Sequence, residues 1–325
     1  MIALGIESTA HTFGVGIVSE EGEILANVYE TYRSETGGMR PFNVAEHHSK
    51  VAVKVVKEAL REAGVSLNEI SVIGFSRGPG IGQPLQIGAV VARSLAVTAK
   101  KPLIGVNHPL AHVEIGRKVA KSYDPVALYV SGGNTQVITH SGDRYVVLGE
   151  TLDIGIGNAQ EKLGREVGLP FPAGPHLDKI RGSWVSLPYV VKGMDLSFSG
   201  LVTEAMRRIK RGENVEDVLW SFMEVAFSML IEVAERALAM TGKKELLLVG
   251  GVAASPRLRE KAEIMCRERG AILKTIPPRL ARDNGAMIAW TSILAYKVFG
   301  ADRLEHTYVL PDWRIDDIRW PLLEV

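Results

Sequence analysis

Apolar segments separated by short polar turns occur twice along the chain, in the same order. Near the start, three such segments are joined by the turns 7–12 and 19–23. Residues 126–148 repeat this plan with the turns 131–135 and 141–143. Short apolar runs bounded by turn residues are typical of strands, so each region predicts a three-stranded antiparallel meander. The expected strands are Ile2–Ile6, Phe13–Val18, Ile24–Tyr29, Val126–Val130, Gln136–Thr139 and Arg144–Leu148.

Helical and strand patterns alternate after each meander. Within Ala45–Ala63, the residues Val51, Val55 and Leu60 recur at helical spacing, which predicts an amphipathic helix with one apolar face. Residues 169–203 have no counterpart in the first half, so we interpret them as an insertion. The other expected elements are the strands Val72–Ser76, Pro102–Val106, Glu245–Val249 and Ile272–Ile276 and the helices Leu85–Ala99, Val215–Met240, Pro256–Arg269 and Gly285–Val298.

Three antiparallel strands followed by βα units, twice over, is the plan of the actin, Hsp70 and sugar-kinase superfamily. We therefore predict an α/β fold of the duplicated actin-like ATPase (ASKHA, RNase H-like) type, with two lobes around a central cleft. The expected division is an N-terminal lobe at 1–124, a C-terminal lobe at 125–300 that carries the insertion, and a C-terminal extension at 301–325 that packs back on the first lobe. Ligands of such a fold are expected where turns of the two halves converge. The alternative is an unrelated pair of α/β domains, because short strand–turn–strand similarity also arises by chance.

Composition excludes several classes of protein. Hydrophobic residues make up 46% and charged residues 23% of the chain, as in soluble globular proteins. No segment approaches the roughly 18 uncharged apolar residues of a membrane span, and the first residues lead directly into a strand pattern, so a cytoplasmic location is expected. Cys266 is the single cysteine, which excludes an intramolecular disulfide and a cysteine-based metal cluster. Its helical context indicates a buried or half-buried side chain.

The charge balance bears on nucleic-acid binding. A formal net charge of +1 indicates no global field that would attract RNA. An RNA substrate would then be held by a local patch or by a partner protein. The densest basic run is 206–211, for which an RNA contact and a solvated helix end both stay open.

Glycine-containing or small-residue turns follow strands in both halves. Ser131–Thr135 joins two predicted strands, and its glycines let backbone N–H groups approach an anion closely. Glu7–Thr12 is its counterpart in the first half. Gly250–Ala253 follows a buried strand and precedes a helix, a place that favours a nucleotide. None is a Walker A loop, since no Gly-Lys-Ser/Thr follows the glycines. Together the three turns predict nucleotide binding.

Two histidines follow the last expected strand of the first half. His108 and His112 are four residues apart, and Pro109 occupies a favourable first position of a helix, so both imidazoles project from one face near the helix start. The spacing lacks the glutamate of the His-Glu-x-x-His zinc hydrolases, and Glu114 lies on another face. On spacing alone, a metal site and a helix cap with one core histidine are both open.

Asp283 occupies the equivalent place in the second half, within the loop Arg279–Met287. In a two-lobed fold the helices after the two last strands cross at the hinge, which would bring their first residues together. We therefore predict that His108, His112 and Asp283 meet in the cleft and bind Zn(II) or Fe(II), with coordination positions left for substrate. Without the histidines, Asp283 would be interpreted as a helix N-cap worth about 1 kcal/mol.

These residues, with several further segments, closely resemble the catalytic subunit of the archaeal and eukaryotic KEOPS/EKC complex, a relative of bacterial TsaD. The segment Asp195–Leu201 has no generic physical explanation and is particularly similar to this family. No single motif is decisive, but the ordered set spans nearly the whole chain. The matching segments are Gly5–Gly14, Ser76–Gly82, Asn107–Glu114, Tyr129–Val137, Gly149–Asn158, Asp195–Leu201, Gly250–Ala254 and Arg282–Ile288.

The resemblance implies a tRNA N6-adenosine threonylcarbamoyltransferase, an acyltransferase of tRNA modification. Such an enzyme moves the threonylcarbamoyl group from threonylcarbamoyl-AMP to N6 of the tRNA adenosine next to the anticodon and releases AMP. One Fe or Zn ion per subunit and an adenine nucleotide (an ATP-, ADP- or AMP-like ligand) are implied. The implied partners are tRNA and the kinase, dimerising and accessory subunits of KEOPS, without a membrane. The helices Ala45–Ala63 and Leu85–Ala99 form the expected docking face.

The resemblance also assigns site residues. The implied metal ligands are His108, His112, Asp283 and Tyr129. The first three are also expected to carry catalysis, because they hold the ion that binds the threonine moiety. Residues 131–133 would face the phosphate and threonylcarbamoyl groups, and Glu161, Gly174 and Asp178 would line the nucleoside pocket. With the glycines of the third turn, the nucleotide-binding residues are Tyr129, Val130, Ser131, Gly132, Gly133, Glu161, Gly174, Asp178, Gly250, Gly251 and Ser255.

Three positions depart from the family pattern. Ser255 stands where the family usually has Asn, Glu161 where it usually has Asp, and Gln86 where Arg is frequent. The first two touch the implied nucleoside pocket, so nucleotide affinity or geometry would differ there. Two other functions stay open. One is a non-enzymatic nucleotide-binding scaffold, and the other is a phosphotransferase of the same superfamily, for which Glu7 is the best candidate base.

Overall fold

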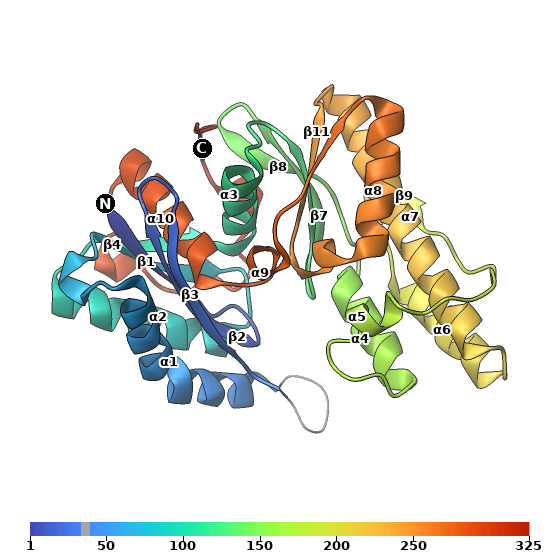
Figure 1. Ribbon diagram of the computed structural model, residues 1–325, viewed down its shortest axis with the longest axis horizontal. Coiled ribbons are helices and arrows are strands. Elements are labelled where there is room, and N and C mark those ends of the chain that lie inside the picture. The colour runs from blue at the N-terminus through green and yellow to red at the C-terminus, as the bar shows by residue number, and fades with distance from the viewer. Residues whose placement is uncertain (34–39, 325) are drawn as a thin grey trace. The chain divides into compact units, whose positions relative to one another are not determined.

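The first meander forms part of a five-stranded mixed sheet with the strand order β3-β2-β1-β4-β5. Strands β1, β2 and β3 pair antiparallel, and β4 and β5 continue the sheet in parallel. The computed structural model describes residues 1–33 and 40–324 (Figure 1); Val325, the end of the expected extension, lies outside these ranges. The strands are β1 (Ile2–Glu7), β2 (Thr12–Ser19), β3 (Ile24–Thr31), β4 (Val72–Gly78) and β5 (Leu103–Asn107).

The second meander forms an equivalent sheet. Its strand order is β12-β11-β6-β7-β8, which from the other end has the same pattern as the first sheet. Here β6, β7 and β8 pair antiparallel, while β11 and β12 are parallel to β6. The predicted duplicated α/β fold of the actin-like type is therefore confirmed. The strands are β6 (Val126–Val130), β7 (Thr135–Ser141), β8 (Arg144–Glu150), β11 (Glu245–Val249) and β12 (Ile272–Lys274).

The chain divides into two compact units, each with one of the sheets. Unit 1 contains residues 1–118 and 283–318, and unit 2 contains 119–282 and 319–324. The expected C-terminal lobe included 283–300, whereas the structure assigns this segment to unit 1. The reason is that the last long helix of the second repeat packs on the first sheet. Most of the expected C-terminal extension also lies in unit 1, and its last described residues lie in unit 2.

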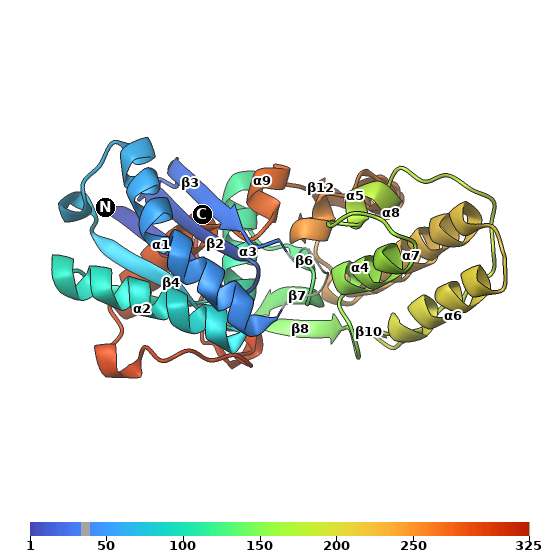
Figure 2. The same cartoon turned by 90° about the horizontal axis from the view of Figure 1, so that it is seen from below.

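Helices cover both faces of the first sheet (Figure 2). Alternate residues of a strand point to opposite faces, so Leu4 and Ile6 pack with α1 and α2 on one side while Gly5 faces α10 on the other. Helix α1 ends where Gly64 adopts a left-handed conformation with φ of 67°. The helices that cover this sheet are α1 (Pro41–Ala63), α2 (Gly82–Ala99) and α10 (Gly285–Phe299), and α3 (His108–Ala120) follows β5.

Close packing of α10 on the first sheet depends on glycine at both surfaces. A Cβ atom at Gly5 would lie 2.1 Å from the backbone nitrogen of Ala289, and one at Gly16 would lie 2.1 Å from that of Ala286. On the helix side, a Cβ atom at Gly285 would lie 2.0 Å from the backbone nitrogen of Gly16. Larger residues at these positions would push the helix away. The glycines thus attach α10, and the residues just before it, to unit 1.

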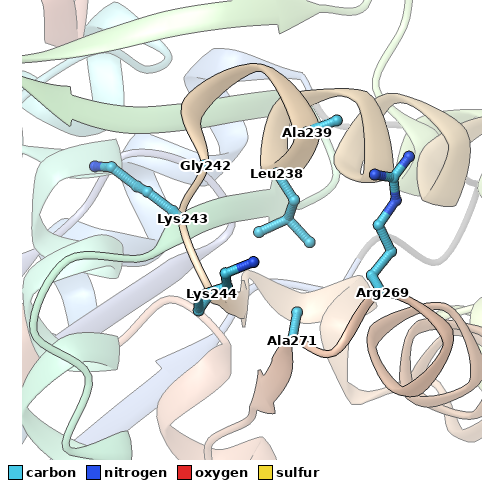
Figure 3. A pocket seen from close by; sticks show the side chains of 7 residues that line it. All are labelled: Leu238, Ala239, Gly242, Lys243, Lys244, Arg269 and Ala271. Carbon is cyan, nitrogen blue, oxygen red and sulfur yellow. The ribbon is translucent and has the colours of Figure 1, made fainter.

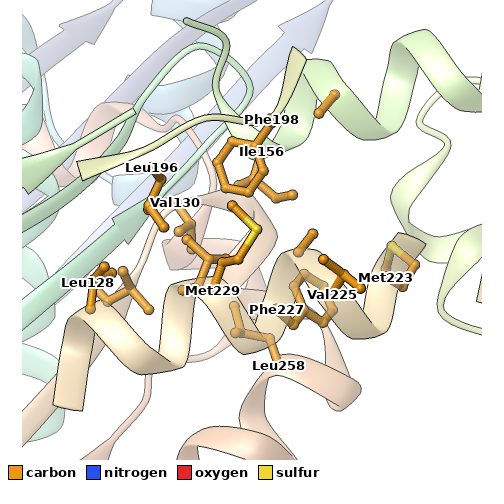
Figure 4. Close-up of a cluster of buried hydrophobic side chains, with 14 of the residues drawn as sticks. Leu128, Val130, Ile156, Leu196, Phe198, Met223, Val225, Phe227, Met229 and Leu258 are labelled. Carbon is orange, nitrogen blue, oxygen red and sulfur yellow. The ribbon is translucent and has the colours of Figure 1, made fainter. Parts of the chain in front are cut away.

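The core of unit 2 lies between the second sheet and the long helices that follow it. Leu128 and Val130 of β6 belong to the same buried cluster as Phe227 and Met229 of α7 and Leu258 of α8 (Figure 4). Helix α4 was not among the elements expected from sequence, because its glycines lower helix propensity. The remaining elements are α4 (Ile156–Glu166), α5 (Gly174–Leu177), β9 (Val191–Lys192), β10 (Asp195–Leu196), α6 (Ser199–Lys210), α7 (Val215–Thr241), α8 (Pro256–Arg269) and α9 (Pro278–Ala281).

The segment 195–201, which lacked an explanation from sequence, is held in part by the carboxylate of Asp153. Asp153 accepts hydrogen bonds from Oγ of Ser197 at 2.6 Å and from the N–H groups of Phe198 and Ser199 at 3.0 Å each. The two backbone donors belong to the start of α6, so Asp153 caps this helix from a distant loop. Although burial alone would raise the pKa of Asp153, these hydrogen bonds lower it below the ordinary range. The motif therefore has a structural role.

Replacing Asp153 by asparagine is expected to destabilise unit 2 by about 1 kcal/mol at neutral pH, the usual cost of a lost helix cap. Since folding lowers the pKa of this carboxyl, its contribution is fully present above the ordinary value of about 4. It is lost progressively as the pH falls from there through the lowered pKa of the folded protein. Urea unfolding of both proteins at pH 7 and pH 3 measures the difference. It should shrink at the lower pH, and equal midpoints at pH 7 would contradict the assignment.

The structure bears on two expectations from composition. Within residues 1–33 and 40–324, no helix is both long enough and apolar enough to cross a membrane. Cys266 is buried in α8, as its helical context indicated. Burial raises the pKa of its thiol to about 11, so the sulfur is a packing group and not a reactive thiolate.

Candidate functional site

The end of β5 places two histidines on one face of α3. Asn107 is the last residue of β5, and its Oδ1 accepts a hydrogen bond from the N–H of Leu110 at 3.1 Å. With this cap the helix begins at His108, so His108 and His112 lie one turn apart on the same face. Their ring centroids are 4.7 Å apart and their planes are nearly perpendicular, at 85°. The cap of this helix is thus Asn107, which leaves both imidazoles for another role.

Asp283 lies just before α10 and faces the two histidines. The N-cap of α10 is its neighbour Asn284, whose Oδ1 accepts the N–H of Met287 at 3.1 Å. Oδ1 of Asp283 instead lies 3.4 Å from Nε2 of His108 and 3.2 Å from Nε2 of His112. The N-cap interpretation of Asp283 therefore does not hold. The carboxylate points to the same place as the two ring nitrogens.

The structure brings the three predicted ligands together. One donor atom from each of His108, His112 and Asp283 lies within 4.8 Å of the other two. Closure of two lobes was the expected reason for this convergence, and that reason is corrected, because all three residues belong to unit 1. Asp283 reaches the histidines because α10 packs on the first sheet. The candidate centre is therefore built within one compact unit.

Burial and mutual contacts set the charges of this group. Burial lowers the pKa of His112, so its imidazole is neutral near pH 7, although the hydrogen bond to Asp283 opposes this shift. Burial alone would raise the pKa of Asp283, but the nearby His108 and His112 lower it well below the ordinary range. Two imidazole nitrogens and one ionised carboxylate oxygen converge. This donor set fits Zn(II) or Fe(II) and leaves coordination positions for other ligands.

Glu7, at the end of β1, contacts the same group. It is fully buried, and its Oε2 lies 3.0 Å from Nδ1 of His108. Its Oε1 accepts the N–H of Thr9 at 2.7 Å. From sequence, Glu7 was expected in a nucleotide-binding turn or as a phosphotransferase base, and this contact was missed. A signal was present, since a carboxylate that ends a wholly apolar strand is buried only with a partner.

Tyr129, the fourth implied metal ligand, lies in β6 and is fully buried. It pairs with Gln136 of β7 and Val249 of β11 in the middle of the second sheet. It belongs to unit 2, whereas the three converging ligands belong to unit 1. Its role at the metal therefore stays a prediction.

The first glycine turn of unit 2 is anchored against the start of α4. The carbonyl oxygens of Ser131 and Gly132 accept hydrogen bonds from the N–H groups of Gly157 and Asn158, at 3.1 and 2.9 Å. Gly132 and Gly133 themselves are exposed. A Cβ atom at Gly132 would meet Oδ1 of Asn158 at 3.5 Å, which is ordinary contact, and one at Gly133 would meet nothing within 4 Å. The turn thus has a fixed backbone and an open outer side.

The other turn of unit 2 packs directly on β6. Gly250 has φ of 94°, and a Cβ atom there would lie 2.3 Å from the carbonyl oxygen of Val130, so only glycine fits. After this turn, Ser255 caps α8 by accepting the N–H of Leu258 at 3.3 Å. Gly250 lies against Val130, and Ser131 follows Val130 directly, so the turn at Gly250 lies next to the turn 131–133. The structure brings these predicted nucleotide-binding residues together within unit 2.

The two departures from the family pattern form specific contacts. The hydroxyl of Ser255 donates a hydrogen bond of 2.6 Å to Oδ1 of Asp178. Glu161 accepts the N–H of Ala173 at 2.8 Å, next to Gly174. Burial raises the pKa of both carboxyl groups, while these hydrogen bonds oppose the shift. Asp178 and Ser255 thus already form a pair, and the Ser255 hydroxyl occupies one acceptor position of that carboxylate.

The basic run at the end of α6 is largely neutralised. Arg207 contacts Glu204 at 2.9 Å and Lys210 contacts Glu166 at 2.9 Å. Arg208 contacts Glu213 at 3.1 Å as well as Glu204. Charges that are paired in this way contribute little to an RNA-binding field. The structure favours a solvated helix end over an RNA contact.

Unit 2 also contains a pocket of about 180 Å³ at the ends of α7 and α8 (Figure 3). Two of its three cationic side chains are already paired, Lys243 with Asp124 and Arg269 with Glu235. Helix carboxyl ends carry a partial negative charge, which disfavours anions there. None of the predicted site residues lines this pocket. Its lining residues are Leu238, Ala239, Gly242, Lys243, Lys244, Arg269 and Ala271.

Comparisons with known proteins agree on one family. Residues 23–290 match the family model described as TsaD, tRNA N6-adenosine threonylcarbamoyltransferase. A protein of Thermococcus kodakarensis named tRNA N6-adenosine threonylcarbamoyltransferase is 51% identical over 322 residues, which cover 98% of each chain. A protein of Thermoplasma acidophilum named probable bifunctional tRNA threonylcarbamoyladenosine biosynthesis protein is 50% identical, over 99% of this chain and 61% of that one.

A more distant likeness concerns the fold. The solved structure of full-length HypF in its phosphate- and nucleotide-bound form has a TM-score of 0.62 to this chain. The match covers 93% of this chain and 56% of HypF, at 10% sequence identity. At this identity the likeness shows a shared fold and no shared activity.

Proposed function

The chain belongs to the TsaD family of tRNA N6-adenosine threonylcarbamoyltransferases, which are enzymes, and we propose that it is a metal-dependent transferase that uses threonylcarbamoyl-AMP. The product is threonylcarbamoyl on N6 of the tRNA adenosine next to the anticodon. The observation that carries the metal dependence is the convergence of His108 Nε2, His112 Nε2 and Asp283 Oδ1 within unit 1. Two imidazole nitrogens and one carboxylate oxygen are donor types that Zn(II) and Fe(II) prefer, and an ion between them would bind all three.

The reaction itself exchanges one bond for another. N6 of the adenosine attacks the carbonyl carbon of the threonylcarbamoyl group, the bond from that carbon to the phosphate oxygen breaks, N6 loses a proton, and AMP leaves. An ion held by His108, His112 and Asp283, with Tyr129 as a further ligand, would supply a Lewis acid that fixes oxygen atoms of the acyl group. The ligand positions are constrained, because Asn107 caps the start of α3 and α10 packs on the first sheet.

The nucleotide part of the substrate is assigned to unit 2. The open side of the turn 131–133 would bind the phosphate through backbone N–H groups, and Gly250 and Gly251 would approach the nucleotide closely. Glu161, Gly174 and Asp178 would line the nucleoside pocket. The hydrogen bond from Ser255 to Asp178 leaves that carboxylate with fewer free acceptor positions for a ribose. We expect weaker nucleotide binding than in a relative with asparagine there.

Gly132→Val is expected to weaken adenine nucleotide binding by at least tenfold, about 1.4 kcal/mol. The branched side chain would occupy the open side of the turn, while the fold has room for it, since the nearest atom to its Cβ is 3.5 Å away. Calorimetric titration with ADP measures the change, and circular dichroism checks the fold. Ser255→Asn is the matched substitution in the other turn and should leave affinity equal or tighter. Unchanged affinity of the Gly132 variant would remove this turn from the site.

Partner proteins would supply most of the tRNA-binding surface, because the net charge is +1 and the basic run of α6 is neutralised. We propose that the kinase, dimerising and accessory subunits of KEOPS fill this role. The face of α1 and α2 that points away from the sheet is a suitable docking surface. It exposes four large apolar side chains, Phe42, Val53, Val90 and Val97.

The decisive experiment is transfer of labelled threonylcarbamoyl from threonylcarbamoyl-AMP to tRNA, with and without these partners and with and without added Fe(II) or Zn(II). Transfer that needs the metal supports the proposal. Full activity in a strong chelator would contradict the metal dependence. The phosphotransferase alternative is weakened by the geometry, because the carboxylate of Glu7 is occupied by His108 and Thr9. A scaffold would show nucleotide binding without transfer.

A further inference from the structure

We propose that Glu7 is a positioning residue of the metal centre, which accepts a hydrogen bond from Nδ1–H of His108 and thereby directs the Nε2 lone pair of that ring to the ion. The proposal rests on the proposed function, since it takes the metal centre as its premise. Glu7 acts through His108 and contacts neither substrate nor metal.

The orientation of the Glu7 carboxylate is set by the turn that follows β1. Its Oε1 accepts both the N–H of Thr9, at 2.7 Å, and the hydroxyl of Thr9, at 2.5 Å. These two bonds leave Oε2 turned toward α3, where it lies 3.0 Å from Nδ1 of His108. The turn is itself held, because Ser8 donates its N–H to Oγ of Ser76 at 2.9 Å. The carboxylate is thus fixed before any metal binds.

This contact decides which nitrogen of His108 can bind a metal. When Nε2 of His108 binds a metal, the single N–H of the ring is on Nδ1, where the Glu7 carboxylate accepts it. Nε2 then presents a lone pair, and it is the atom that faces Asp283 at 3.4 Å. A lone pair and a carboxylate oxygen face each other favourably only across a cation. The same bond therefore orients the ring and creates the place for the ion.

Burial makes this bond strong. Glu7 has no exposed surface and His108 is 4% exposed, so water does not compete for either partner. A carboxylate behind a ligating imidazole also raises the basicity of the ring, and its loss typically costs about 10–100-fold in metal affinity. We therefore expect Glu7 to affect metal affinity without supplying a ligand atom.

The tautomer can be measured on the unaltered protein. Nitrogen-15 NMR of the zinc-loaded chain should show His108 with a proton on Nδ1 and a metal-bound Nε2. An unprotonated or metal-bound Nδ1 would overturn the proposal directly. This measurement needs no variant and so does not depend on how well a variant folds.

The affinity can be measured with Glu7→Gln, which keeps the size of the side chain and removes its charge. Metal-free wild type and variant are titrated with Zn(II) against a chromophoric chelator, and with Co(II) to record the ligand-field absorption bands. We expect about 10–100-fold weaker zinc binding and shifted Co(II) bands. The matched control is Glu114→Gln, another fully buried carboxylate on α3, which pairs with Arg117 at 2.8 Å. It loses stability but should keep wild-type affinity and bands.

The outcomes separate this proposal from the proposed function. Equal metal affinity and equal bands in wild type and Glu7→Gln would overturn the role of Glu7 alone. Equal losses in Glu7→Gln and Glu114→Gln would do the same, because they would reflect general destabilisation. Wild type that binds no metal would overturn both proposals. A selective loss in Glu7→Gln, in a protein that fails to transfer threonylcarbamoyl, would support the role of Glu7 and overturn the function.

Discussion

Replacing His112 by alanine is expected to abolish stoichiometric metal binding and threonylcarbamoyl transfer while the chain stays folded. The side chain is fully buried and supplies one of three converging donor atoms, so its removal leaves only two. The loss of a ligand should exceed the roughly 10–100-fold that is typical for a residue that only supports a ligand. Metal content after purification, zinc titration and the transfer assay measure these effects. Asp283→Asn should act nearly as strongly, because a neutral amide is a poor ligand beside two neutral imidazoles.

A matched control is His140→Ala, which removes another buried histidine. His140 lies in unit 2, and its Nε2 donates to the carbonyl oxygen of Trp320 at 2.8 Å. This variant should lose some stability and keep wild-type metal content. Nucleotide affinity should change little in His112→Ala, since the glycine turns of unit 2 are assigned to the nucleotide. Full metal content in His112→Ala, with the fold intact by circular dichroism, would exclude the proposed centre.

Gly16→Ala is expected to destabilise unit 1 by at least about 1–3 kcal/mol and to weaken metal binding together with it. The added Cβ would lie 2.1 Å from the backbone nitrogen of Ala286 and 2.4 Å from its Cα, and backbone atoms of a packed helix have little freedom to move. Relief of the clash would push the start of α10 away from the sheet. Asp283 directly precedes this helix, so its carboxylate would move away from the histidines. Thermal unfolding and zinc titration measure the two effects.

The control for Gly16→Ala is the same substitution in an open place. A Cβ atom at Gly200, in the first turn of α6, would meet nothing within 4 Å. Alanine there should leave metal affinity unchanged and keep or raise stability by up to about 1 kcal/mol, because alanine favours the helix. If Gly16→Ala had the stability and zinc affinity of wild type, close packing of α10 would not be what places Asp283.

Much of the fold follows from local sequence pattern. The apolar runs of β1 and β6 and the turns after them recur in both halves, and a strand bounded by turn residues is defined by a few neighbouring side chains. The ends of α1, α7 and α8 each coincide with a glycine in the left-handed conformation, which is also a local signal. Helix α4 was not predicted, because its glycines interrupt the helical pattern of apolar residues. In addition, its first turn is stabilised by hydrogen bonds to the turn 131–132, which is distant in the sequence.

The candidate ligands were also predictable, but not the reason that they meet. The spacing of His108 and His112 alone places them on one helical face, and the duplication points to Asp283. Which sheet α10 packs on is decided by close approach to Gly5 and Gly16, far away in the sequence. The apolar pattern of α10 does not indicate which sheet the helix packs on, because the residues on all sides of its first half are buried. The assignment of Asp283 to unit 1 thus came only from tertiary packing.

The contact between Glu7 and His108 is a second feature that could not be predicted from the sequence alone. The sequence determined that a carboxylate ends β1 and that a histidine begins α3, because both follow from where apolar runs stop. Which oxygen faces which nitrogen depends on β4 lying between β1 and β5, and on Thr9 holding the other oxygen. Strand order is a property of the assembled sheet, and hydrogen-bond direction is a property of fixed neighbours. Both were therefore decided by the tertiary structure alone.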